Sequence, residues 1–205
     1  MIIRTIFASI LLAFVLPSNA ASNGDWQLEY ERTNIKIHTR AVAGSKFLQT
    51  KAEIKLNVSA KLVLAKLSVS DRCWDWQARC KKSTTIKQIS ENESIVYAVI
   101  NMPWPLSDRD FVFRSVYIID AENKTIKIEL SPAKGKYAKT KYVRGSGNAT
   151  YIIKELSASE SELIIEMHTE FAGSISPKLL NSKLVSELRK DIDLLIKLLK
   201  TKETT

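Results

Sequence analysis

Residues that commonly perform catalysis are few in this chain. Its two histidines, His38 and His168, each fall on the polar side of a segment in which apolar and polar residues alternate, a pattern typical of a half-exposed strand. Glu166 and Glu170 share the predicted face of His168. These three side chains are able to perform acid–base chemistry, but we expect that face to meet water. The sequence signatures of zinc proteases, phosphate-binding loops, serine hydrolases and Cys-x-x-Cys redox sites are absent, so we do not predict an enzyme.

Three consecutive charges precede an apolar strand, as Asp108-Arg109-Asp110 before Phe111. An unpaired charge buried beside a strand is costly, so these residues require partners. The preceding Pro103-Trp104-Pro105 cannot be helical, and its two prolines remove backbone donors. We therefore expect the chain to leave the hydrogen-bond ladder of a sheet at this corner.

The only two cysteines, Cys73 and Cys80, lie seven residues apart. On one helix they would be separated by ~10.5 Å along the axis, which is too far for a disulfide. We predict a disulfide between Cys73 and Cys80, which requires a loop or bend between Trp74 and Arg79. The alternative is two small buried hydrophobic side chains, and two cysteines alone do not make a metal site.

The N-terminus has the pattern of a secretory signal peptide. Arg4 precedes an apolar run over residues 6–16, and Pro17-Ser18-Asn19-Ala20 follows it. We expect cleavage near Ala20, which makes residues 1–20 a signal peptide and places the mature protein in the periplasm or outside the cell. The run is too short to span a bilayer. Loss of Arg4 lowers the formal charge only from +9 to +8.

A basic segment lies between two later strands. Residues 131–147 contain four lysines interleaved with Tyr137 and Tyr142. Such a segment suits nucleic acid in a cytosolic protein, but in an exported one it suits transient contact with an anionic membrane surface. A solvated edge is the alternative. The predicted membrane-contact residues are Lys134, Lys136, Lys139 and Lys141.

The periodicity of the chain predicts mostly strands. They are expected over residues 34–42, 47–56, 84–89, 94–102, 111–119, 125–130, 148–153 and 162–171. Residues 24–32 are expected to form a short helix or a lead-in. Because polar turns join most of these strands, we predict an antiparallel sheet and an α+β fold in one domain.

Two helices accompany these strands. The first is expected after residue 57, with Ser59 as its N-cap. The second is expected as one long helix from Pro177 to about Lys200, capped by Ser176, with a leucine or isoleucine at every fourth position. At roughly 35 Å it is long enough to cross a small sheet.

The segment from Pro103 to Val112 resembles the signature of START domains, a family that binds lipids. Further similarities follow in the expected order: Trp74 after the first helix, Val143-Arg144-Gly145 in a later strand, and Gly173-Ser174-Ile175-Ser176-Pro177 before the last helix. The resemblance spans most of residues 26–200. It implies the helix-grip fold, in which a curved antiparallel sheet wraps around a long C-terminal helix and encloses a hydrophobic cavity.

We therefore expect residues 21–205 to form a single lipid-binding domain, and we predict that it is monomeric and without cofactor, metal or nucleic-acid partner. It would bind a lipid or sterol-like molecule and carry or present it between membranes. A cyclase-type enzyme in a similar cavity, and a non-lipid interaction module with a filled core, are the alternatives. Arg109 is expected either to meet the head group of the lipid or, preferably, to brace the corner. The other expected lining residues are Tyr97, Val99, Trp104, Phe111, Ile126, Ile128, Met167, Phe171, Leu184, Leu188 and Ile192.

Overall fold

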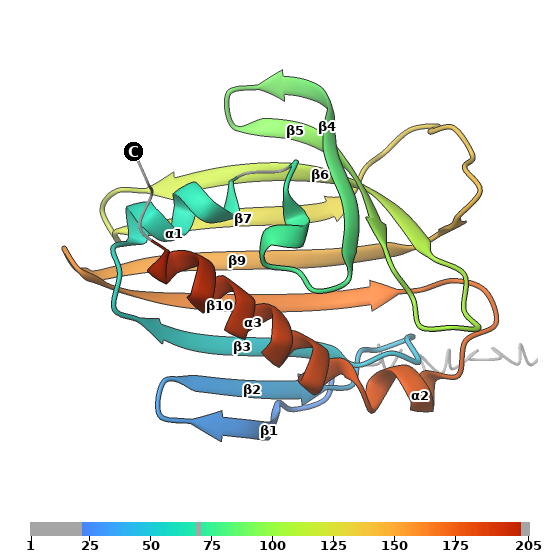
Figure 1. Ribbon diagram of the computed structural model, residues 1–205, viewed down its shortest axis with the longest axis horizontal. Helices are drawn as coiled ribbons and strands as arrows, with labels where there is room; N and C mark the ends of the chain where they lie inside the picture. Colours follow the sequence, from blue (N-terminus) through green and yellow to red (C-terminus); the bar gives the residue numbers. More distant parts are fainter. Residues whose placement is uncertain (1–21, 69–70, 202–205) are drawn as a thin grey trace, which may run out of the picture.

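The computed structural model describes residues 22–68 and 71–201, and the predicted signal peptide lies outside these residues. Over the described part, ten strands form one curved sheet (Figure 1). Nine of them are antiparallel neighbours in the order β1-β2-β3-β10-β9-β7-β6-β5-β4, and the short β8 pairs in parallel with β6. The strands are β1 Gln27–Arg32, β2 Ile35–Arg40, β3 Gln49–Leu56, β4 Cys80–Ser90, β5 Glu93–Ile100, β6 Arg109–Asp120, β7 Thr125–Pro132, β8 Val143–Arg144, β9 Ser146–Ser157 and β10 Glu160–Glu170. The predicted α+β fold is confirmed.

The expectation for residues 24–32 was wrong, because Gln27–Arg32 forms the edge strand β1. A two-residue turn joins it to β2, and the two strands pair from Gln27 with Thr39 to Arg32 with Ile35. Most of β1 is exposed, so its sequence lacks the apolar alternation that identifies a half-buried strand.

The helices cover one face of the sheet (Figure 1). Helix α1, Ala60–Leu67, begins where the Ser59 side chain accepts a hydrogen bond from the backbone N–H of Leu62, as expected for an N-cap. A short 3-10 helix, Cys73–Asp75, follows. No helix among the described residues is long and apolar enough to cross a membrane.

The expected single C-terminal helix is divided into α2, Pro177–Asn181, and α3, Leu184–Lys200. Ser176 caps α2 and Pro177 takes its first position. The division follows from the next polar residues. The Asn181 amide group bonds the backbone of Lys46 and Leu48 at 3.1 Å each, and the Ser182 hydroxyl donates to the Leu179 carbonyl. Side chains that bind backbone groups in this way compete with helix continuation.

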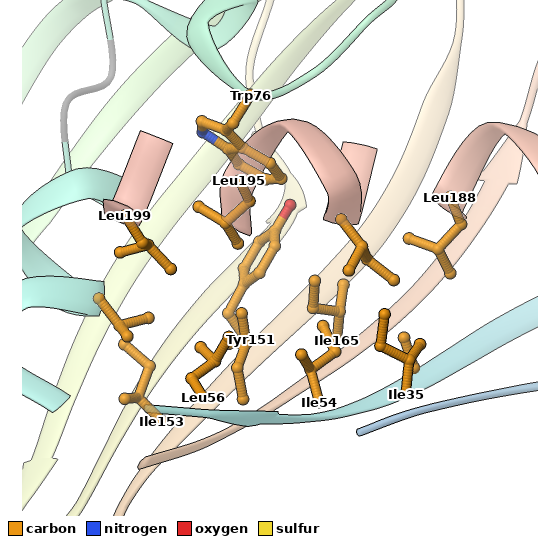
Figure 2. Packing of buried hydrophobic residues seen from close by; sticks show 14 of the residues in the cluster. Ile35, Ile54, Leu56, Trp76, Tyr151, Ile153, Ile165, Leu188, Leu195 and Leu199 are labelled. Atoms are coloured by element: carbon orange, nitrogen blue, oxygen red, sulfur yellow. The ribbon is translucent and has the colours of Figure 1, made fainter. Parts of the chain in front are cut away.

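The main core lies between the sheet and the C-terminal half of α3 (Figure 2). Ile54, Ile153 and Ile165 project from the strands toward Ile192 and Leu195 of α3, and each of these side chains is at most 1% exposed. Leu199 extends the same stripe to the end of α3. Ile192 therefore belongs to the packed core, and not to an open cavity as the sequence analysis expected.

We predict that Ile192→Ala lowers the free energy of unfolding by about 2–5 kcal/mol, because it removes buried methyl groups and leaves a void in a packed region. Urea unfolding of the full chain measures this change. Asp193→Ala on the exposed side of α3 is the control, with an expected change within about 0.5 kcal/mol. Equal stabilities of the two variants would contradict the assignment of Ile192 to the core.

Candidate functional site

The corner before β6 presents one tryptophan to solvent. Trp104 stands between Pro103 and Pro105, and the Trp104–Pro105 peptide bond is cis. The Trp104 side chain is 92% exposed, an unusual placement for so large an apolar group. Because the neighbouring prolines lack backbone N–H groups, this segment cannot continue the hydrogen bonding of the sheet.

Asp108 closes this corner by binding its two sides. Its Oδ1 accepts the Met102 backbone N–H at 3.1 Å and its Oδ2 pairs with Lys81 of β4 at 3.0 Å. The hydrogen bond from Lys81, followed by that from Met102, holds the pKa of Asp108 below its usual value. The Asp108 carbonyl also accepts a bond from the Val143 N–H of β8.

Arg109 is buried, with 3% exposure, and braces the turn before α2. Its Nε donates to the Phe171 carbonyl at 3.0 Å, its Nη2 to the Ala172 carbonyl at 3.2 Å, and its Nη1 to the Ser107 carbonyl. Ala172 and Gly173 have positive φ, so Arg109 holds the carbonyls of an unusual turn. It does not pair with Asp108 or Asp110 and does not line the cavity described below.

Asp110 is fully buried and faces the outer side of the sheet. Arg144 donates to both of its oxygens, at 2.8 and 3.0 Å, and Thr140 donates to Oδ2 at 2.7 Å. Burial raises the pKa of Asp110, but the hydrogen bonds from Arg144, Thr140 and Tyr97 outweigh it and hold this pKa below its usual value. Asp110 thereby anchors the loop of residues 133–142, which carries the four predicted membrane-contact lysines, all of them exposed.

A cavity of about 900 Å³ lies between the sheet, α2 and the N-terminal half of α3. Its sheet wall is largely apolar, with Phe111, Phe113, Ile128, Tyr151 and Met167 among its residues. Trp104, Leu106 and Leu179 lie at the corner and on α2, where the cavity wall reaches the surface. Such a volume is typical of sites for small hydrophobic ligands.

Seven of the twelve predicted lining residues line this cavity. They are Trp104, Phe111, Ile128, Met167, Phe171, Leu184 and Leu188. The other five do not line it. Arg109 and Ile192 lie in the places described above. Ile126 packs against the main core, and Tyr97 and Val99 face the outer side of β5. There Tyr97 is hydrogen-bonded to Asp110 and Thr140.

On β5 the prediction named residues of the wrong face of the strand. Val96, Ala98 and Ile100 line the cavity instead of Tyr97 and Val99. Both faces of β5 carry apolar residues, because the loop of residues 133–142 and its anchor Asp110 cover the outer one. Alternation therefore cannot indicate which set points inward.

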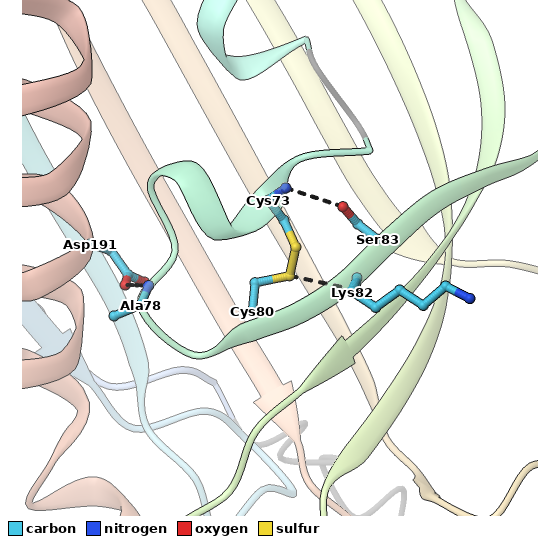
Figure 3. The surroundings of a disulfide bond; sticks show 6 residues. All are labelled: Cys73, Ala78, Cys80, Lys82, Ser83 and Asp191. Carbon is cyan, nitrogen blue, oxygen red and sulfur yellow. Dashed lines mark hydrogen bonds between the residues drawn. A yellow bond between two sulfur atoms is a disulfide. The ribbon is translucent and has the colours of Figure 1, made fainter. Parts of the chain in front are cut away.

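The two cysteines form a disulfide at a Cα–Cα distance of 5.8 Å, and the 3-10 helix supplies the bend that it needs (Figure 3). Both line the cavity, as does Trp76, which packs edge-on against Tyr151 at 5.9 Å. Trp74, which carries the resemblance in sequence, is 49% exposed and lies outside the cavity wall. The loop between the cysteines was missed as a cavity wall, since only its geometry turns Trp76 inward.

The histidines do not form a catalytic relay. Ser45 Oγ and Glu170 Oε1 lie 3.1 and 3.6 Å from the same ring nitrogen of His168, Nε2, whereas a Ser-His-acid relay needs its partners on opposite nitrogens. The Nδ1 atom of His38 is buried without a hydrogen-bond partner in the described part of the chain. The described residues also contain no cluster of three or more potential metal ligands.

A curved antiparallel sheet closed by a C-terminal helix over an apolar cavity is the architecture of helix-grip proteins. The chain belongs to the START domain family, whose model matches residues 12–202. The expectation drawn from the segment Pro103 to Val112 is thereby confirmed at the level of the family and the fold.

Three known proteins illustrate the similarity. The uncharacterized protein PA1579 of Pseudomonas aeruginosa is 26% identical over 180 residues, which cover 84% of this chain and 85% of that protein. A STAR-related lipid transfer protein from Xanthomonas axonopodis has a TM-score of 0.76 at 24% identity, covering 86% of this chain and 99% of that one. Human StAR-related lipid transfer protein 5 has a TM-score of 0.78 at 16% identity, covering 89% and 88%.

We predict that Asp110→Asn flattens the acid limb of the stability profile. Because the folded-state pKa is lowered, ionised Asp110 stabilises the protein above its unfolded-state pKa of about 4, and this contribution is lost as the pH falls through the folded value. Urea unfolding between pH 7 and pH 2.5 tests this. The variant should be less stable at pH 7 and lose less stability on acidification, whereas Asp193→Asn should follow the wild-type profile. Parallel profiles for wild type and Asp110→Asn would refute the role of this carboxylate.

Proposed function

We propose that this protein holds a lipid or another hydrophobic molecule in the cavity beneath α2 and α3 and carries it between membranes. The observation that carries the proposal is the cavity of about 900 Å³ with an apolar sheet wall. Membership of the START family supports a hydrophobic ligand. The names of the Xanthomonas and human proteins attribute lipid transfer to those proteins, in agreement with this proposal.

Native mass spectrometry of the full chain, purified without detergent and then extracted with solvent, tests the proposal. A bound apolar mass of lipid size is expected, and its fragmentation identifies the ligand class. A protein that is bare after purification and takes up no lipid from liposomes would contradict the proposal. Turnover of an added hydrophobic substrate by the purified protein would favour the cyclase alternative.

The substitution Ala98→Trp tests whether the cavity is hollow. Ala98 lines the cavity from β5, so an indole ring there fills empty space, and we expect lipid uptake to fall at least tenfold with little loss of stability. In a filled core the same change would overpack the interior and cost about 1–3 kcal/mol. Ala121→Trp, in the exposed turn after β6, is the matched control and should leave uptake unchanged.

The end of the molecule that carries Trp104 is the proposed membrane-contact surface. We define this surface as Trp104 of the corner before β6, Leu179 of α2 and the loop of residues 133–142. The corner, α2 and the loop lie at the same end of the sheet (Figure 1). Trp104 and Leu179 are exposed beside the cavity, and the loop adds four exposed lysines. Apolar side chains next to cations suit an interface in which anionic head groups overlie hydrocarbon.

We predict that the charge reversal of the four loop lysines weakens binding to anionic vesicles at low salt, and that Trp104→Ala weakens it also at high salt, where charge attraction is screened. Vesicle co-sedimentation measures both effects. A control variant reverses four exposed lysines near the opposite end of the molecule: Lys55, Lys61, Lys197 and Lys200. If the control loses as much binding as the loop variant, attraction is a matter of net charge and the proposed surface is wrong.

We further propose that the protein acts after export, in the periplasm or outside the cell. The leader-like pattern over residues 1–20 and the disulfide between Cys73 and Cys80 support this location. Fractionation of cells that express the full chain, followed by N-terminal sequencing of the mature protein, tests it. The expected mature N-terminus is Ala21.

A further inference from the structure

The charged residues that line the cavity all lie on one wall. The sheet contributes only uncharged polar groups, among them Ser115 and the Tyr151 hydroxyl. The charged wall consists of the loop between the cysteines, the residue before α3 and the N-terminal half of α3. Its residues are Arg79, Lys183, Glu187, Lys190 and Asp191.

Most of the charge on this wall is satisfied internally. Arg79 binds both oxygens of Glu187, at 2.7 and 3.1 Å, and Lys190 adds a third contact to Glu187 at 3.0 Å. Asp191 differs. Its Oδ1 accepts the Ala78 backbone N–H at 2.8 Å (Figure 3), and no described residue donates to its Oδ2. A carboxylate has about four acceptor sites, so Asp191 retains unused capacity on the cavity wall.

Two further polar groups gather beside Asp191. The Tyr151 ring extends from β9 toward Trp76 and α3 (Figure 2), and its hydroxyl lies near the Gln77 side chain, which also lines the cavity. Burial, and then the negative charge of Asp191, raise the pKa of Tyr151, so its hydroxyl stays protonated. Burial, followed by repulsion from Glu187, raises the pKa of Asp191 to about 6, against the opposing effects of the Ala78 N–H, Arg79 and Lys190. Asp191 is therefore ionised but poorly solvated at neutral pH.

We propose that Asp191, with Tyr151 and Gln77 beside it, is the subsite for the polar end of the ligand, and that this end is an uncharged group that donates a hydrogen bond, such as a hydroxyl. The inference rests on the proposed lipid-binding function. A hydroxyl donor satisfies the open side of the carboxylate, whereas an anionic head group would meet its repulsion.

The balance of charge decides against a cationic head group. Arg79, Lys183 and Lys190 already outnumber Glu187 and Asp191, so an added cation would increase an existing excess of positive charge on a poorly solvated wall. A phosphate at Asp191 finds no free guanidinium, because Arg79 is bonded to Glu187 and Arg109 is committed to three carbonyls outside the cavity. The remaining cation, Lys183, is exposed and lies about 12 Å from Asp191 along the axis of the helix.

Displacement of the neutral dye Nile red from the full chain at pH 8 tests the subsite. The three competitors share a ten-carbon chain and differ in the polar end: 1-decanoylglycerol, decanoic acid and decylamine, each below its micelle concentration. The wild type should bind the glycerol ester about tenfold more tightly than either charged competitor, the size expected of one hydrogen bond to a charged group.

The variant Asp191→Asn keeps the size of the side chain and an acceptor for the Ala78 N–H but removes the charge. We expect it to bind 1-decanoylglycerol about fivefold more weakly and to bring decanoic acid within about threefold of the ester. Asp193→Asn, on the exposed side of the same helix, is the control and should behave as wild type. If Asp191→Asn does not fold, judged by circular dichroism, Tyr151→Phe takes its place and should weaken ester binding at least threefold.

The outcomes separate the two proposals. Failure of the dye and of all three competitors to bind would overturn the lipid-binding function itself. Equal binding of the three competitors, or an Asp191→Asn variant indistinguishable from wild type, would overturn the subsite alone. Tighter binding of decylamine, lost in Asp191→Asn, would show that the polar end is a cation and overturn the uncharged assignment.

Discussion

Three consecutive charged residues, Asp108, Arg109 and Asp110, hold together the end of the molecule at which the cavity wall reaches the surface. A charge placed beside a buried strand requires specific partners, and each of the three finds them in a different part of the chain. Asp108 closes the proline corner against β4 and β8, Arg109 fixes the turn before α2, and Asp110 anchors the loop of residues 133–142. Strand alternation makes this possible, because Arg109 points to the helix side of β6 while Asp110 points to the outer side.

Two glycines, Gly145 and Gly147, leave room for close contacts beside the cavity. A Cβ atom at Gly145 would collide with the ring of Phe111, and one at Gly147 would lie 2.8 Å from the His168 carbonyl oxygen. Gly145 thus lets the Phe111 ring lie against the backbone between β8 and β9, and Gly147 lets β9 approach β10 closely. The basic loop then returns to the sheet through β8, directly before them, so the anchoring of the loop and the shape of the cavity depend on the same short segment.

The fold was predictable from the sequence because its signals were local: alternating strands, polar turns, the N-caps Ser59 and Ser176, and a leucine-rich final helix. What escaped prediction depends on contacts between distant segments. The inward face of β5 is decided by the loop that covers its outer face, and the division of the last helix by the bonds of Asn181 to residues 46 and 48. Asp191 was not singled out from the sequence, because nothing in the local pattern of the helix distinguishes it, and only its position beside Tyr151 gives it a candidate role.

The two halves of α3 therefore make different kinds of contact. Leu195 and Leu199 seal its C-terminal half against the sheet, while its N-terminal half, together with α2, lines the cavity and contacts the loop between the cysteines through polar bonds. Polar contacts near a cavity mouth exchange with water at little net cost, whereas the apolar core does not open without exposing buried surface. If the helices open to admit a ligand, we therefore expect the movement in α2 and the first turns of α3, because their contacts cost less to break than the apolar contacts of the C-terminal half. The disulfide between Cys73 and Cys80 would keep the facing loop in place during such a movement, so that the proposed subsite would retain one fixed wall.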